Sequence, residues 1–248
     1  MVNVVKGGYS YYGAPIGILL LDTRYPRVPG DVGNATTFNF HVVYKIIKGA
    51  YGKKVVETPF EDPKLLESFV KGAQELEREG VKAITTDCGF LALFQKELSS
   101  AVSIPIFTSS LMQVPLVYGM LRKDKKVGVI TFQKRSLTKK HLEAVGIEFT
   151  PIVIYGMDEC SEWHHCLPSS PSKPIEFDVN KMESEVVEVA KTMIRENPDI
   201  GAIVLECVNM PPYAYAVQKA TGLPVFDITT LIKYVYSGLV RRPFNGWL

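Results

Sequence analysis

The most constraining feature of this sequence is an internal repeat. Residues 81–122 align with residues 200–241 without a gap, and this alignment pairs Cys88 with Cys207. In each copy a short apolar run (VKAITTDC and IGAIVLEC) ends at the cysteine, and a second run (IPIF and LPVF) follows. A duplicated unit of this kind predicts two similar lobes, each presenting one thiol at the end of a strand, and one site shared between them.

The remainder of the chain alternates between expected strands and expected helices. We expect strands at residues 16–22, 55–58, 81–86, 104–107, 127–131, 200–205 and 223–226. We expect helices over residues 63–80, 91–98, 110–121, 179–197 and 229–240, with Asp62, Ser109 or Ser110, and Asp178 as N-caps. This alternation predicts the α/β class, with parallel sheets covered by helices on both faces. The first lobe is expected to be 1–107 plus 228–248, and the second 108–227.

Charge and composition exclude several classes of function. The formal net charge of +2 comes from interspersed residues of both signs, so nucleic acid has no basic stripe to follow. The sequence has no apolar run of signal-peptide or membrane-spanning length, and we expect a soluble, cytoplasmic protein with no membrane partner. No phosphate-binding glycine motif follows a strand, which disfavours nucleotide chemistry.

The paired cysteines suggest proton transfer at carbon. A thiol has an ordinary pKa of about 8.5, so a catalytic thiol needs help to ionise. A helix N-terminus gives such help through its partial positive charge, and Gly89 permits a tight turn after Cys88. Asn209, with Pro211 behind it, is expected to cap a helix after Cys207. Buried core cysteines are the alternative, and the matched positions of the pair weigh against it.

The loop LDTRYPRVPGDVGN, the cysteine at the end of each half and the segment ECVNMPPYA together resemble the aspartate/glutamate racemase superfamily. This superfamily includes hydantoin racemases, maleate isomerases and arylmalonate decarboxylase. The resemblance implies two pseudo-symmetric α/β lobes with a small acid or cyclic amide in the cleft between them, and neither pyridoxal phosphate nor a metal. It also implies that Cys88 and Cys207 are two acid/base groups on opposite faces of one carbon, with Asp22 near the first thiol. Capping the turn of the PRVPGDVGN loop is the alternative role for Asp22.

Residues around the thiols are the candidate substrate contacts. Thr23 and Thr131 could hydrogen-bond a carboxylate, or else only satisfy backbone groups. The remaining candidates flank the cysteines: Gly89, Phe90, Val208 and Asn209. Glutamate racemases have Asn-Thr after the first cysteine and Thr-His after the second, so free glutamate is not the preferred substrate here. Phe90 could face a bulkier group, as in a hydantoin, or belong to the core. Arg24 and Arg27 could attract an acid or simply be solvated.

A second group of metal-binding residue types lies in a polar, Pro- and Ser-rich insertion at residues 155–174. Its members are Cys160, His164, His165 and Cys166. The spacing fits no established zinc pattern, so we interpret the segment as a surface loop or lid anchored by Trp163.

The sequence therefore predicts a cofactor-independent racemase or epimerase acting on an amino acid or hydantoin, with Cys88 and Cys207 as the acid/base pair. A lyase similar to arylmalonate decarboxylase and a cis-trans isomerase remain alternatives on the same scaffold. A noncatalytic small-acid binding protein, or a redox protein linking the two cysteines, is a further alternative. We expect a homo-oligomer from chain size alone.

Overall fold

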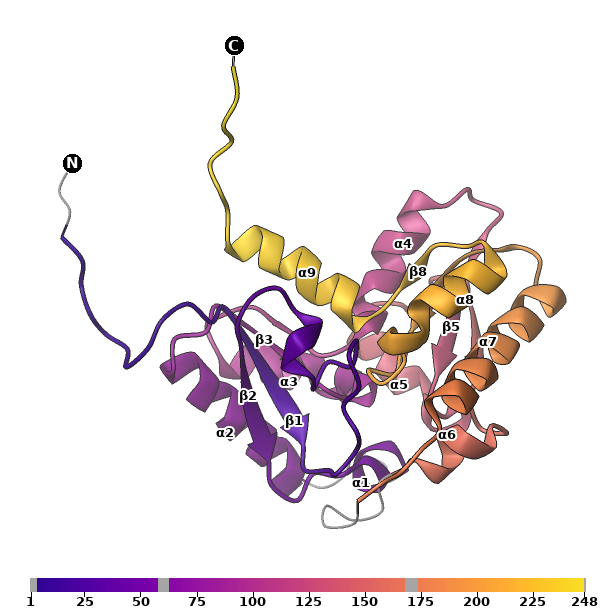
Figure 1. Cartoon of the computed structure of the whole chain (residues 1–248), viewed down its shortest axis with the longest axis horizontal. Coiled ribbons are helices and arrows are strands. Elements are labelled where there is room, and N and C mark those ends of the chain that lie inside the picture. Colours follow the sequence, from indigo (N-terminus) through magenta and orange to yellow (C-terminus); the bar gives the residue numbers. More distant parts are fainter. Residues whose placement is uncertain (1–3, 58–62, 168–173, 248) are drawn as a thin grey trace.

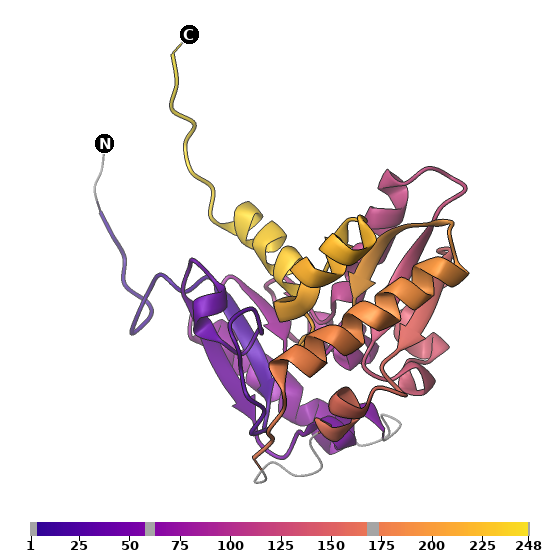
Figure 2. The same cartoon turned by 45° about the vertical axis from the view of Figure 1, so that its right-hand side comes forward.

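Two parallel sheets with the same strand order organise the computed structural model, which describes residues 4–57, 63–167 and 174–247. The first sheet has the order β2-β1-β3-β4, formed by β1 (Ile16–Leu21), β2 (Val42–Ile47), β3 (Ala83–Thr86) and β4 (Ile106–Phe107). The second has the order β6-β5-β7-β8, formed by β5 (Lys126–Thr131), β6 (Ile152–Gly156), β7 (Ile200–Leu205) and β8 (Val225–Phe226). Each sheet with its helices makes one lobe (Figures 1 and 2). The predicted α/β class with two similar lobes is confirmed.

Helices connect the strands and cover the sheets. They are α1 (Gly52–Val56), α2 (Pro63–Arg78), α3 (Gln95–Ala101), α4 (Val114–Met120), α5 (Lys139–Ala144), α6 (Ser161–His165), α7 (Val179–Glu196), α8 (Ala214–Thr221) and α9 (Ile228–Leu239). Short 3-10 turns lie at Ala35–Thr37, Gly89–Phe94, Ser110–Gln113, Lys134–Ser136 and Pro211–Tyr213. Asp178 caps α7 as predicted, because its carboxylate accepts from the backbone N–H groups of Asn180 and Lys181. Asp62, the predicted cap of α2, lies outside the described residues.

The duplication seen in the sequence is reproduced in the pairing of the strands. Ile84 lies opposite Ile106 between β3 and β4, and their repeat equivalents Ile203 and Val225 lie opposite each other between β7 and β8. The two copies therefore share the same register as well as the same order of strands. Strand register decides which side chains leave the end of each strand, so the residues after β3 and β7 emerge at matching places.

One predicted strand is wrong and several elements were not predicted. Residues 52–56 form the short helix α1 instead of a strand at 55–58, because two adjacent valines fit the buried side of either element. The second strand of the first sheet is β2, whose sequence VVYKII is partly exposed at the sheet edge and lacks a continuous apolar run. Its mirror element β6 and the helix α5 were also not predicted, and the helix expected after Cys207 is α8, which begins at Ala214 behind a 3-10 turn.

The last helix crosses from the second lobe to pack against the first. Ile228, Leu231 and Ile232 of α9 share one apolar cluster with Ile18 of β1 and Phe107 of β4. Figure 2 shows α9 leaving the second lobe and lying over the first, with both chain ends extending on that side. The division into lobes 1–107 plus 228–248 and 108–227 stays a prediction.

All the strands of each sheet are parallel, so their carboxyl ends meet at one edge. The loops after β1 and β3 in the first lobe, and after β5 and β7 in the second, meet between the lobes. Across the described parts of the chain, no helix is both long and apolar enough to span a membrane.

Candidate active site

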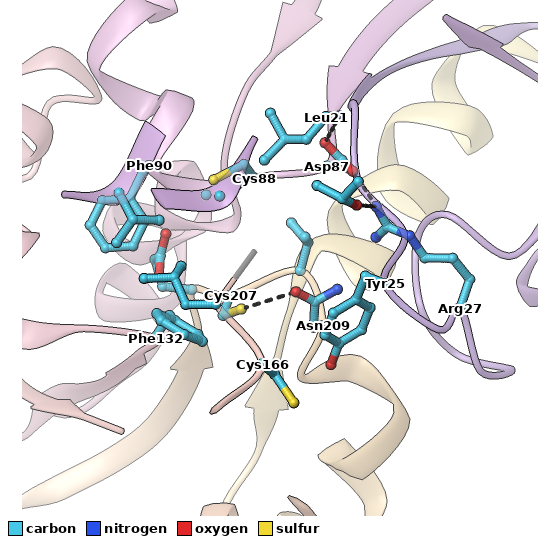
Figure 3. Close-up of a pocket in the computed structure, with 17 residues that line it drawn as sticks. Leu21, Tyr25, Arg27, Asp87, Cys88, Phe90, Phe132, Cys166, Cys207 and Asn209 are labelled. Carbon is cyan, nitrogen blue, oxygen red and sulfur yellow. Dashed lines mark hydrogen bonds and ion pairs between the residues drawn. The ribbon is translucent and has the colours of Figure 1, made fainter. Parts of the chain in front are cut away.

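A pocket lies between the lobes where these loops meet (Figure 3). It contains about 510 Å³ of space free of protein atoms, including the solvent at its mouth. The lining side chains come from both halves of the chain: Leu21, Thr23, Tyr25, Arg27, Gly52, Val56, Asp87, Cys88, Gly89, Phe90, Phe132, Cys166, Leu167, Glu206, Cys207, Val208 and Asn209. Most of this wall is apolar or aromatic, and its polar groups cluster around two cysteines.

The two cysteines are the repeat-related pair. Cys88 follows β3 and Cys207 follows β7, and each is 8% exposed. Both are free thiols that line the same pocket, one from each lobe, as Figure 3 shows. The structure therefore brings together the two residues on which the sequence prediction depended.

The surroundings of both thiols disfavour the thiolate form. Burial raises the pKa of Cys88 and of Cys207 well above the ordinary value, and the carboxyl group of Glu206 raises both further. The backbone N–H of Phe90 lowers the pKa of Cys88, and that of Asn209 lowers the pKa of Cys207, but these effects are smaller. The expectation that helix N-termini would make the thiols acidic is wrong, because desolvation outweighs the few N–H groups present.

Each thiol follows an acidic residue that the sequence interpretation overlooked. Asp87 precedes Cys88, and Glu206 precedes Cys207, at equivalent positions of the repeat. Both carboxylates are buried, at 3% and 0% exposure. The signal was available in the sequence, since an acidic residue at the end of an apolar strand is rare unless it is paired or functional.

Arg27 links the first acid to the second thiol through a buried network. It donates to Asp87 Oδ2 at 2.6 Å and to Asp31 Oδ1 at 3.0 Å. Asn209 Nδ2 donates to the other oxygen of Asp31 at 2.6 Å, which turns the amide oxygen toward Cys207 Sγ at 3.8 Å. Arg27 is thus neutralised by two carboxylates, and Asn209 is held in one orientation beside the thiol.

Glu206 has fewer partners. Its Oε2 accepts a hydrogen bond from Thr131 Oγ1 at 2.7 Å, whereas its Oε1 is buried without a partner among the described residues. Burial raises the pKa of Glu206 to about 7. A carboxyl group with this pKa changes its charge near neutral pH.

Most of the residues predicted to contact substrate or catalyse the reaction line the pocket, and two of them, Thr131 and Asp22, do not. Thr23, Gly89, Phe90, Val208 and Asn209 all line it, although Asn209 does not cap a helix. Thr131 is fully buried and holds Glu206, so it acts on the carboxyl group and not on a ligand.

Asp22 is the predicted catalytic residue that the pocket leaves out. It does not line the pocket, because its carboxylate faces the N–H of Gly49 and the guanidinium of Arg24. The N–H that Asp22 binds belongs to the turn after β2 and not to the PRVPGDVGN loop that the alternative named.

The Cys160–Cys166 segment divides into residues inside and outside the pocket. Cys166 lines the pocket, while Cys160 does not. Trp163 is 1% exposed, lies 5.9 Å from the ring of Tyr213, and donates from Nε1 to the Met182 carbonyl. Its predicted anchoring role agrees with this burial, and the lid itself stays a prediction, since residues 168–173 lie outside the described part. Within the described ranges no three His, Cys, Asp or Glu side chains gather into a metal site.

Two parallel-sheet lobes that hold one cysteine each at a common pocket define a class of α/β proteins, the racemase type. The chain belongs to the Asp/Glu/Hydantoin racemase family, whose model matches residues 39–232. The family resemblance inferred from the sequence is confirmed.

The chain is also similar to individual curated proteins and, in its fold, to a solved structure. The chain is 31% identical over 241 residues to a dimethylsulfoniopropionate lyase of Durusdinium sp. clade D, covering 94% of this chain and 79% of the relative. It is 29% identical over 245 residues to dimethylsulfoniopropionate lyase 3 of Emiliania huxleyi, covering 94% of this chain but only 62% of that relative. Allantoin racemase from Klebsiella pneumoniae superimposes with a TM-score of 0.61 at 14% identity, over 94% of this chain and 97% of that one.

Proposed function

We propose that the protein is a cofactor-independent enzyme whose pocket thiols move a proton at the carbon next to the carboxylate of a small substrate. The observation that carries this proposal is the meeting of Cys88 and Cys207 in one small, largely apolar pocket. A thiolate is a suitable base for carbon once it forms, and an apolar pocket keeps water away from the carbanion.

The chemistry that we favour is elimination. Two relatives that align with 94% of this chain are named dimethylsulfoniopropionate lyases. The substrate in that name has a carboxylate, and its sulfonium leaving group is bonded to the second carbon from that carboxylate. One thiolate takes the proton next to the carboxylate, the new electron pair forms a carbon–carbon double bond, and the carbon–sulfur bond breaks. The products are acrylate and dimethyl sulfide, and the proton passes from the thiol to solvent. The overall reaction needs no oxidant, reductant or second substrate.

Racemisation is the second candidate, favoured by the contribution of one thiol from each lobe. Elimination needs one base, whereas inversion of a carbon needs a base on one face and an acid on the other. A single pocket that holds both thiols would therefore suit racemisation of an amino acid or a hydantoin as well as it suits elimination.

Three measurements separate these reactions. The protein is incubated with dimethylsulfoniopropionate, and acrylate and dimethyl sulfide are quantified. In parallel, aspartate, glutamate and hydantoins are incubated in deuterium oxide, and deuterium incorporation and the change of optical hand are followed. Cys88→Ser and Cys207→Ser are compared with Cys160→Ser, a cysteine outside the pocket.

The lyase is supported if the wild type releases both products, if a pocket variant releases them at least about 100-fold more slowly, and if Cys160→Ser releases them at the wild-type rate. Deuterium exchange with inversion, lost in both pocket variants, identifies a racemase instead. Full activity of both pocket variants, or no turnover of any substrate, refutes the proposal of thiol-based proton transfer.

A further inference from the structure

The two repeat-related acids differ in how they are neutralised. Asp87 accepts a hydrogen bond from the backbone N–H of Leu21 at 2.7 Å and an ion-pair contact from Arg27 at 2.6 Å. Within the described part of the chain Glu206 has no ion pair, and its partners are the hydroxyl of Thr131 and, more weakly, the backbone N–H of Phe132. The symmetry of the fold thus places two equivalent carboxyl groups at the pocket and satisfies only one of them.

The unsatisfied carboxyl group is held firmly between the loops that carry the thiols. A Cβ atom added to Gly89 would lie 2.1 Å from Glu206 Oε1, so the carboxyl group packs directly against the residue that follows Cys88. Glu206 itself precedes Cys207. A buried carboxylate oxygen without a hydrogen-bond partner is costly unless a ligand supplies one, and Glu206 is among the residues that line the pocket.

The rest of the pocket suits a positively charged ligand group. Phe90, Phe132 and Tyr25 contribute aromatic rings, and Leu21 and Leu167 contribute apolar walls. Aromatic rings bind organic cations through their negative faces, and a dry carboxylate adds direct charge attraction. The pocket's arginine is already shared by two carboxylates, so an ionised Glu206 leaves a negative charge uncompensated.

We propose that Glu206 is the anchor for a cationic group of the substrate, an organic sulfonium or quaternary ammonium, enclosed by the aromatic side chains of the pocket. This inference deepens the proposed function, because it assigns the part of the pocket that recognises the leaving group. It concerns binding, so it can be tested without turnover.

Binding of a cation there has a consequence for the thiols. The negative charge of Glu206 is one of the causes that raise the pKa of both cysteines. A sulfonium beside Glu206 offsets that charge, so the thiols ionise more readily when the substrate is bound than when the pocket is empty. The substrate would therefore help to generate its own base.

Cation binding depends on pH through Glu206. The ionisable or charged groups around it in the pocket are Tyr25, Arg27, Asp87, Cys88, Cys166 and Cys207. The cysteines and Tyr25 have raised pKa values and stay neutral at pH 7, and Arg27 stays charged. Burial raises the pKa of Asp87 as well, but its ion pair with Arg27 and the N–H of Leu21 oppose this effect. Because Glu206 has a pKa of about 7, the affinity for a cation is expected to rise as the pH rises through 7.

The test measures binding of two unreactive ligands of similar shape by isothermal titration calorimetry. The first ligand, which we call the cation for its quaternary nitrogen, is 3-(trimethylammonio)propionate. Its counterpart is 4,4-dimethylpentanoate, which has the same carboxylate but carbon in place of the charged nitrogen. The wild-type protein is compared with Glu206→Gln and with Glu148→Gln, an exposed acid that does not line the pocket. We expect the cation to bind about tenfold more tightly than its counterpart at pH 8, with a ratio near one at pH 5.5.

Glu206→Gln should give a ratio near one at both pH values, and Glu148→Gln should keep the wild-type ratio at each pH. Thr131→Val, which keeps the acid but removes its hydroxyl partner, should move the pH dependence upward, since that hydrogen bond lowers the pKa of Glu206. Equal binding of the two ligands by the wild type, no binding of the cation, or an unchanged preference in Glu206→Gln would overturn the inference. A Glu206-dependent preference without any turnover would refute the proposed function alone, and turnover of the sulfonium without that preference would refute only this inference.

Discussion

Replacing Arg27 with methionine tests the buried network that fixes the pocket. Arg27 donates to two carboxylates, Asp31 and Asp87, whose side chains are each 1% exposed. Methionine fills similar space but leaves both acids without a cation. Removing one partner of a buried ion pair destabilises a protein by about 3–5 kcal/mol, which is a large fraction of the roughly 5–15 kcal/mol that stabilises a typical domain. Arg27→Met should therefore lose at least about 3 kcal/mol at pH 7.

The loss should shrink in acid. Burial already raises the pKa of Asp87 with Arg27 in place, and the pKa will rise further without it. A carboxyl group whose pKa is higher in the folded than in the unfolded state destabilises the fold above that pKa, and the penalty disappears as the pH falls below the unfolded value of about 3.9. The difference from wild type should thus be smaller at pH 5 than at pH 7.

Urea unfolding followed by circular dichroism at both pH values measures these free energies of unfolding. The matched control is Arg24→Met, because Arg24 is 55% exposed and pairs with Asp22 at 3.4 Å. An exposed pair of this kind contributes about 0–1 kcal/mol. A loss below about 1 kcal/mol in Arg27→Met, or a loss that grows in acid, would refute the account of the network.

Three further predictions follow from the packing. Gly89→Ala places a Cβ 2.1 Å from Glu206 Oε1 and should lower kcat about 100-fold. The control is Gly238→Ala, which has open space around it. It should leave activity unchanged and stabilise α9 by about 0.5–1 kcal/mol in thermal unfolding. Trp163→Ala should cost about 3–5 kcal/mol in urea unfolding, since the ring is 1% exposed, and Trp247→Ala should cost nothing measurable. The two pocket thiols should react with iodoacetamide slowly at pH 7, and mass spectrometry should show rates still rising above pH 9; a plateau below pH 8 would contradict their raised pKa values.

The fold was predictable to the extent that it depends on local patterns. The strand at 200–205 and the helix beginning after Asp178 were expected at the bounds that the structure shows, because a continuous apolar run and a capping side chain are local signals. The edge strand β2 was missed for the opposite reason. Its Lys45 pairs with Glu75 of α2, and such a half-exposed strand depends on neighbours that a sequence window does not contain.

The site was predictable in part. The repeat identified both cysteines, and the acid before each was equally visible but was not used. Asp31 could not have been assigned from its own neighbourhood, because its role comes from contacts with Arg27 and with Asn209, which lies in the other half of the chain.

The sequence by itself determined the duplicated α/β architecture and the position of one thiol at the end of a strand in each half, since periodicity and repetition are properties of the chain. Only the tertiary structure decided the charge state of the pocket. A carboxyl group or a thiol acquires its pKa from the groups that folding brings around it. Folding pairs Asp87 with Arg27, whereas Glu206 has neutral partners, the Thr131 hydroxyl and the Phe132 N–H, among the described residues. For that reason two equivalent positions of the repeat have different chemistry.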